Sequence, residues 1–218
     1  ALLRGSGNKD YAAMKLMVFL LAGSALLFPG LLAIYHASGL DTFEMVGLAA
    51  HGFDLEFQIF CHPFIYIGFG VLAGMFPLHG WSPTGHVADP SAVSMLHAGV
   101  LSVGMHLLPQ GAVYWAPTFA ALAAIGIVYG AFVAMRQTDF KFVIGFSSVS
   151  HMGILLLGIN LAVLGIAGDD ALNGAVFQMF AHGATTPIFF STVGFIYDRA
   201  HSKTITDFGG LGSQMPEP

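Results

Sequence analysis

Long apolar runs separated by short polar connections dominate the chain. A transmembrane helix needs about 20 predominantly apolar residues to cross roughly 30 Å of hydrocarbon. Six runs predict membrane-spanning helices: Leu16–Tyr35, Phe57–Phe76, Ala92–Leu108, Val113–Met135, Phe142–Ala167 and Ala171–Tyr197. The pattern therefore predicts an all-α fold, a polytopic transmembrane helix bundle with about six spans, formed by one transmembrane domain over residues 1–218.

The third run, Ala92–Leu108, is short for a span. At about 1.5 Å of rise per residue it reaches only ~25 Å. If all six runs cross the membrane in alternating directions, the basic and acidic residues of the connections nevertheless fall on opposite sides. One side receives every basic residue, namely Arg4, Lys9, Lys15, Arg136, Lys141, Arg199 and Lys203, and the other receives Asp41, Glu44, Asp54, Glu56, Asp169 and Asp170. Without the short run this segregation is lost, so we count it as a span and expect the basic side to be cytoplasmic or matrix-facing.

The composition agrees with an integral membrane protein. Hydrophobic residues make up 56% of the chain and charged residues 9%, whereas soluble domains carry roughly 25% charged residues. A formal charge of −5 provides no basic field for nucleic acid. The single cysteine, Cys61, excludes an internal disulfide and a paired-cysteine metal site. We expect no cofactor and no metal on this chain, and both of its ends look cut.

The most informative segment lies between the second and third runs. It reads FPLHGWSPTGHVADPSAVSMLHAGVL over residues 76–101 and is rich in His, Pro and Gly. Ionisable side chains near the hydrocarbon are costly and usually mark an ion path. Irregular backbone at that depth survives only where protein or a water cavity surrounds it. The segment therefore indicates transport across the membrane.

Three histidines within the predicted spans are candidates for a proton relay. His97 lies in the third span, His151 in the fifth and His182 in the sixth, and Ser147 and Ser150 stand close to His151. Histidine gains and loses a proton near neutral pH without any perturbation. Three histidines on three spans predict a lateral polar row. The alternative for each is an interhelical hydrogen bond without titration.

Other polar residues predict gating or interface roles. His79 and His86 flank a turn that contains Pro83, and they either gate the path or belong to an ordinary loop. Lys141 is expected to anchor its helix at the interface by extending its amine toward water. His62, next to Cys61, is expected to be a packed polar residue rather than a metal ligand.

These motifs resemble the antiporter-like proton-pumping subunits of respiratory complex I, the M-type above all (subunit 4 in mitochondria), a superfamily shared with Mrp-type antiporters. The likeness is carried by four blocks: DYAAMKLMVFLLAGSALL, FPLHGWSPTGHVADPSAVSMLHAGVL, YGAFVAMRQTDFKFVIGFSSVSHMGILLLGI, and GAVFQMFAHG followed by IYDRAHSKTITDFGGL.

The resemblance implies two inverted repeats, the first ending and the second beginning near residues 110–111. It also implies proton translocation coupled to electron transfer elsewhere, in a complex I-like NADH:quinone oxidoreductase. Partners would be the other membrane-arm subunits of a large hetero-oligomeric complex. FMN, iron–sulfur clusters and quinone would sit in those partner subunits. The expected location is the bacterial plasma membrane, with the mitochondrial inner membrane as the alternative.

The sequence also departs from the family pattern. The lysine that usually precedes FPLHGW is replaced by Leu72, and the proline two residues later by Gly74. A second lysine would fall at Val103 without a gap. About ten residues of the usual helix have no counterpart here, so we expect residues to be missing between Leu101 and Val103.

Two alternatives to a complex I pump remain open. An Mrp-type cation/proton antiporter subunit would share the helices but need no redox partner. A structural membrane subunit that pumps nothing would explain the absent lysines.

Overall fold

The computed structural model describes residues 9–85 and 105–210, and the expectation of an all-α fold is confirmed. Apart from one isolated bridge between Asp139 and Thr204, the regular structure described is helical. The long helices are α1 (Lys9–Ser38), α3 (Leu55–Ala73), α7 (Pro109–Met135), α8 (Phe140–Val163) and α9 (Gly168–Ala200). The short ones are α2 (Met45–His51), η1 (His79–Trp81), α4 (Ser82–Gly85), α6 (Met105–Leu107) and η3 (Ile205–Asp207).

Four of these helices are long and apolar enough to cross a membrane: α1, α3, α7 and α8. They correspond to the predicted first, second, fourth and fifth spans. Helix α9 covers the predicted sixth span but is not among the four, since polar side chains such as His182 and Thr186 interrupt its apolar sequence. The predicted third span, Ala92–Leu108, lies outside the described residues except for its last four positions.

Two predicted spans end earlier than the apolar runs suggested. Helix α3 stops at Ala73 rather than Phe76, because Gly74 adopts a left-handed conformation (φ 75°) and its N–H bonds to the carbonyls of Gly70 and Val71. Such a glycine is a common helix terminator. Helix α8 stops at Val163 rather than Ala167. Apolar composition alone therefore overestimated both helices by three or four residues.

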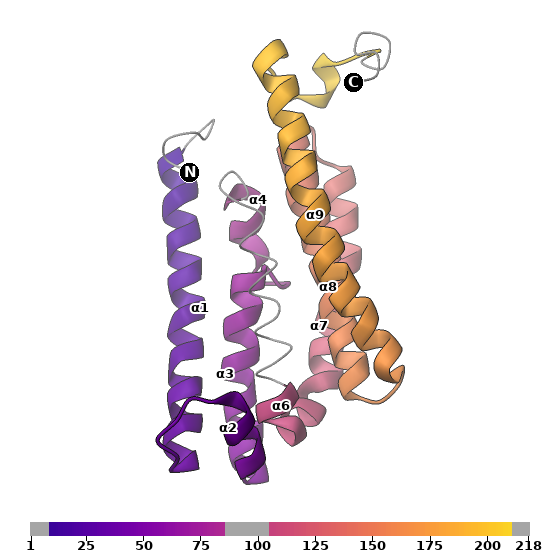
Figure 1. Ribbon diagram of the computed structural model, residues 1–218. Helices are drawn as coiled ribbons and strands as arrows, with labels where there is room; N and C mark the ends of the chain where they lie inside the picture. The colour runs from indigo at the N-terminus through magenta and orange to yellow at the C-terminus, as the bar shows by residue number, and fades with distance from the viewer. Residues whose placement is uncertain (1–8, 86–104, 211–218) are drawn as a thin grey trace.

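The long helices form a layered bundle in the order α1, α3, α7, α8, α9 (Figure 1). Helices α3 and α7 run parallel, since Gln58 lies at Gly111 and Tyr66 stacks on Phe119. The other adjacent pairs are antiparallel. Helix α4, which ends at Gly85, and helix α6, which begins at Met105, lie at opposite ends of α3 (Figure 1).

Glycines bring the helices of each pair into close contact. A Cβ on Gly130 of α7 would stand 2.7 Å from the amide nitrogen of Ser150 on α8, and a Cβ on Gly153 would stand 2.8 Å from the carbonyl of Ala123. Gly23 of α1 and Gly68 of α3 meet in the same way. Small residues at helix crossings are typical of membrane bundles, where close backbone packing drives association.

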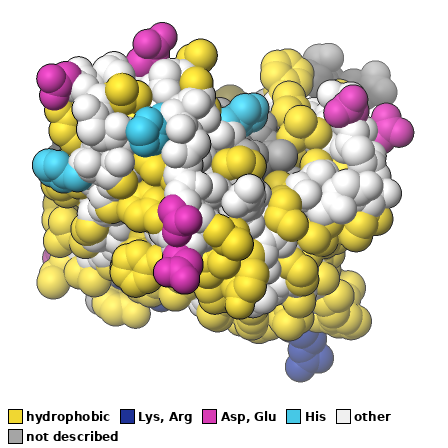
Figure 2. Space-filling model, turned by 90° about the horizontal axis from the view of Figure 1, so that it is seen from below, with side chains coloured by type: hydrophobic (Ala, Val, Ile, Leu, Met, Phe, Trp, Pro, Cys, Tyr) yellow, Lys and Arg dark blue, Asp and Glu magenta, His cyan; other side chains and the backbone are white. Residues whose placement is uncertain are grey.

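The charged residues gather at the two ends of the bundle. The start of α1 and the end of α9 share one end, together with the α7–α8 connection that carries Arg136 (Figure 1). We call this the basic end. The opposite end contains α2, the start of α3 and the start of α9, with Glu44, Glu56, Asp169 and Asp170, and we call it the acidic end. Figure 2 shows that end, with acidic and histidine side chains set among hydrophobic ones.

Candidate functional site

The candidate site is formed where α8 and α9 pack antiparallel. Asp139 precedes α8 as its N-terminal cap, and its side chain accepts a hydrogen bond of 2.8 Å from the backbone N–H of Lys141. Near the other end of α8, Gly158 lies against Ala171 and Ala175 at the start of α9. These small residues allow the two helices to approach. A cavity lies between them along the stretch of α8 from Phe140 to His151.

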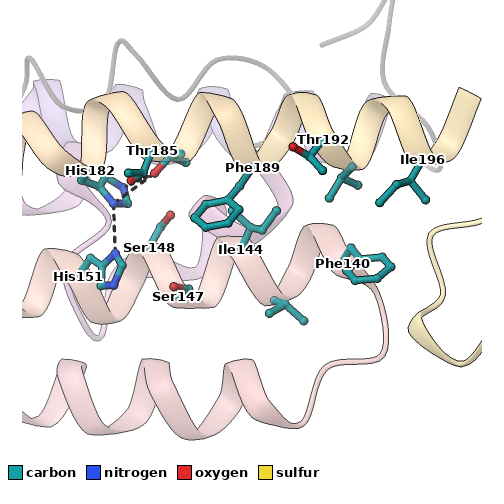
Figure 3. A pocket seen from close by; sticks show the side chains of 13 residues that line it. Phe140, Ile144, Ser147, Ser148, His151, His182, Thr185, Phe189, Thr192 and Ile196 are labelled. Carbon is teal, nitrogen blue, oxygen red and sulfur yellow. Dashed lines mark hydrogen bonds between the residues drawn. The ribbon is translucent and has the colours of Figure 1, made fainter. Parts of the chain in front are cut away.

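His151 of α8 and His182 of α9 point toward one another across this interface (Figure 3). Their Nδ1 atoms are 3.4 Å apart, and the rings meet edge to face at an interplanar angle of 89°. His182 is only 4% exposed, whereas His151 is half-buried. A hydrogen bond between two Nδ1 atoms requires a hydrogen on one and a lone pair on the other. The two imidazoles can therefore hold one proton between them.

The Thr186 hydroxyl completes the polar group around His182. It lies 3.2 Å from Nδ1 and 3.3 Å from Nε2 of that ring and is itself buried. Threonine hydroxyls both donate and accept hydrogen bonds. Thr186 can thus follow a change of tautomer at His182.

A cavity of about 360 Å³ extends from the two histidines along α8 and α9 (Figure 3). Ser147 and Ser148 line it from α8, and Thr185, Thr186 and Thr192 line it from α9. The remaining lining side chains are apolar: Phe140, Val143, Ile144, Phe189, Val193 and Ile196. Hydroxyls therefore stand at intervals along a mostly apolar wall.

The structure brings together three of the five residues predicted for the relay. His151, His182 and Ser147 line the same cavity. Ser150 does not; its hydroxyl donates a hydrogen bond of 2.9 Å to the backbone carbonyl of Ile127 on α7. His97 lies outside the described residues.

The residues predicted for gating lie near the basic end of the bundle. The ring of His79 packs between Phe76 and Tyr129, with centroids 5.6 and 5.0 Å away. Burial and then the positive charge of Lys15 lower the pKa of His79, and a backbone hydrogen bond at Pro77 opposes them. His86 lies outside the described residues.

Pro83 belongs to the contact of α4 and α8, and Lys141 lies in the first turn of α8. A Cβ on Gly145 of α8 would stand 2.7 Å from the Cα of Pro83, so the turn packs directly on that helix. Lys141 is half-buried in the first turn of α8, beside Phe140 at the far end of the cavity.

Sequence reasoning did not assign Ser148, Thr185, Thr186 or Thr192 to the site, although all four line the cavity. Thr186 follows His182 by four positions. Residues at i and i+4 share a helix face, and this spacing could have identified Thr186. Within residues 9–85 and 105–210, no three His, Cys, Asp or Glu side chains are grouped closely enough to hold a metal ion.

A family model described as "NADH:quinone oxidoreductase/Mrp antiporter, TM" matches residues 1–217. The chain is 35% identical over 223 residues to NAD(P)H-quinone oxidoreductase chain 4 2 of Microcystis aeruginosa, covering 98% of this chain and 39% of that relative. It is 37% identical to chain 4 3 of Picosynechococcus sp., covering 98% and 40%. Since the first match is longer than the 218 residues present here, that relative has internal residues with no counterpart in this chain.

Among solved structures, respiratory complex I from Thermus thermophilus with bound NADH contains a similar chain. The TM-score is 0.87 at 26% sequence identity, and the match covers 98% of this chain and 47% of that one. The chain thus spans about two fifths of the length of the curated relatives and about half of the solved one.

Proposed function

The chain belongs to the NADH:quinone oxidoreductase/Mrp antiporter family of transmembrane proteins, and from this premise we propose that it belongs to a membrane-arm subunit that translocates protons. The subunit is part of a complex I-like NAD(P)H:quinone oxidoreductase. Electron transfer takes place on partner subunits that hold FMN, iron–sulfur clusters and quinone. This chain supplies groups that carry protons and no redox centre.

The observation that carries the proposal is the contact between His151 and His182. Two histidines on adjacent helices lie with their Nδ1 atoms 3.4 Å apart beside a cavity with several hydroxyls. Histidine can both donate and accept a proton through its ring nitrogens, and the short distance allows a proton to pass directly from one ring to the other. Ionisable residues inside transmembrane bundles are costly and typically mark proton relays.

The relatives favour a quinone oxidoreductase over an Mrp-type antiporter. The family description covers both classes, but the relatives from Microcystis aeruginosa and Picosynechococcus sp. are NAD(P)H-quinone oxidoreductase chains. Flavin and iron–sulfur subunits co-purifying with the intact subunit would support the first class. Purification without them would support the antiporter.

We place the protein in a bacterial plasma membrane, among the other membrane-arm subunits of the complex. We infer that the boundary between its two repeat halves falls near residue 110, a position close to where α7 begins. Ser147 and the hydroxyls of Ser148 and Thr186 assist the two histidines, with water between them.

The proposal is tested in the complete subunit, assembled with its partners in proteoliposomes. His151→Ala and His182→Ala are each compared with His36→Ala, which changes an exposed histidine at the end of α1. A positioned proton-transfer group typically contributes about 10²-fold or more, so we expect proton pumping to fall at least about tenfold in the first two variants. Pumping equal to that of His36→Ala in an assembled complex would reject the proposal.

A further inference from the structure

A second polar row follows one face of α3, away from the histidine pair. Gln58, His62 and Tyr66 recur every four residues, so their side chains lie one above another. All three are buried, and they face the α7 side of the helix. Polar side chains aligned in this way inside an apolar helix need partners across the interface.

Both ends of the row have such partners. The side-chain oxygen of Gln58 accepts hydrogen bonds from the backbone N–H groups of Gln110 and Gly111, at 3.0 and 3.3 Å. This end is close to the acidic end of the bundle, since Glu56 is exposed there. At the other end, the Tyr66 hydroxyl accepts a hydrogen bond of 2.6 Å from the side chain of Asn160 on α8.

His62, in the middle of the row, is different. Its side chain is 2% exposed, and within the part of the chain that the structure describes its Nδ1 atom has no hydrogen-bond partner. Its ring lies 5.8 Å from that of Tyr66 and 6.1 Å from that of Phe119. Buried polar atoms nearly always have a partner, and the exceptions call for a functional or solvent explanation.

The row is separate from the site formed by His151 and His182. It lies between α3 and α7, whereas the two histidines lie between α8 and α9. Asn160 and His151 belong to the same helix but are nine positions apart, which turns their side chains to opposite faces of α8. No step of the proposed relay at His151 uses His62.

We propose that His62 is a second proton-carrying site of this chain, reached from the acidic end past Gln58 and ending at the Tyr66–Asn160 pair. The ligand is water, which delivers the proton as hydronium. The neutral ring takes that proton on the nitrogen that carries no hydrogen, leaving water. It then releases a proton from the other nitrogen to a second water molecule, which returns the ring to its neutral form. The inference rests on the proposed function and adds to it a residue that the sequence favoured as merely packed.

The test uses the complete complex in proteoliposomes with three substitutions at this position. His62→Gln keeps hydrogen-bonding atoms but cannot titrate, His62→Glu restores a titratable group, and His62→Leu removes both properties. We expect His62→Gln and His62→Leu to lower proton pumping at least about tenfold, since a positioned proton-transfer group typically contributes about 10²-fold or more. His62→Glu should recover part of the loss.

Cys61→Ser is the matched control, because the Cys61 thiol contacts the carbonyl of Gly30 on α1 and is not part of the row. It should pump as the unchanged complex does. Full pumping by His62→Gln in an assembled complex would overturn the inference, and so would equal losses in His62→Gln and His62→Glu. If His151→Ala lowers pumping while His62→Gln does not, only the second site is refuted. If neither lowers it, the proposed function fails as well.

Discussion

The Tyr66 hydroxyl of α3 and the Asn160 side-chain amide of α8 are 94 positions apart in sequence and 2.6 Å apart in space. Asn160 also donates to the backbone carbonyl of Leu156, at 2.7 Å. This contact connects the α1–α3 part of the bundle to the α7–α8–α9 part through side chains buried in the main hydrophobic core.

A double-mutant cycle on this pair should reveal a real coupling energy. Tyr66→Phe and Asn160→Leu each remove one partner, and we expect a coupling of about 0.6 kcal/mol and at most about 1.7 kcal/mol, the range of interhelical hydrogen bonds in membranes. The measurement is the free energy of unfolding in detergent for the two single variants and the double one. Purely additive effects would show that the contact contributes nothing.

Gln58 should act as the N-terminal cap of α7, supplied by another helix. Leu108 precedes α7 without a capping side chain, and the Gln58 oxygen accepts from the first N–H groups instead. Gln58→Leu should therefore cost about 1–2 kcal/mol, as loss of a helix cap does. Gln137→Leu is the matched control, because the Gln137 side-chain amide bonds only to the carbonyl of Val133, four positions earlier in the chain, among the contacts described. Equal unfolding midpoints for the two variants would contradict the capping role.

Glycine substitutions should separate helix packing from helix propensity. Gly130→Ala forces a Cβ against the backbone of α8, and overpacking of this kind costs about 1–3 kcal/mol. Gly174→Ala in α9 meets no atom within 4 Å, so it should stabilise by about 0.5–1 kcal/mol, because glycine is a poor helix former. Thermal unfolding of both variants in detergent checks the opposite signs. A stabilised Gly130→Ala variant would show that α7 and α8 are not held this closely.

His79 should make stability depend on pH in the acidic range. Burial and Lys15 lower its pKa below the ordinary value of 6.5, so the unfolded chain binds a proton that the folded chain does not. Its contribution is therefore absent well above pH 6.5, and stability is lost as the pH falls below that value. Unfolding midpoints measured from pH 8 to pH 5 should show a smaller acid loss in His79→Gln. If the unfolding midpoint of His79→Gln fell with pH as steeply as that of the unchanged protein, the acid loss of stability would come from other groups.

A change at Lys15 checks the predicted effect of its charge on His79. Lys15→Met removes the neighbouring positive charge, so the pKa of His79 should rise toward its ordinary value and the acid loss should become smaller. Arg136→Met changes another cation at the basic end and serves as the control. A Lys15→Met curve that follows the Arg136→Met curve would exclude the electrostatic effect of Lys15.

Much of the helical layout follows from local sequence. Apolar length located α1, α3, α7 and α8 because a bilayer imposes that length on any spanning helix. Ser147 and His151 are four positions apart and therefore share a helix face, and both line the cavity. Helix ends were less accessible, since Gly74 stops α3 inside an apolar run.

Long-range pairing could not be obtained in the same way. Ser150 is adjacent to His151 in sequence, but a one-residue step rotates a side chain by about 100° around the helix. The Ser150 hydroxyl therefore points to α7, where it donates a hydrogen bond to the backbone carbonyl of Ile127. The pairing of Tyr66 with Asn160 likewise depends on how α3, α7 and α8 pack, which no local pattern encodes. That the Nδ1 atom of His62 has no hydrogen-bond partner among the described residues becomes visible only once its neighbours are in place.

The orientation of the two facing imidazoles determines the path that a proton can take through the pair. Because His151 and His182 meet through Nδ1, each ring turns its Nε2 atom away from the other, so the pair has two outer terminals and one shared inner hydrogen. A proton arriving at one terminal can displace the inner hydrogen and release a different proton at the other. Net charge then crosses the gap between the helices without either ring having to travel.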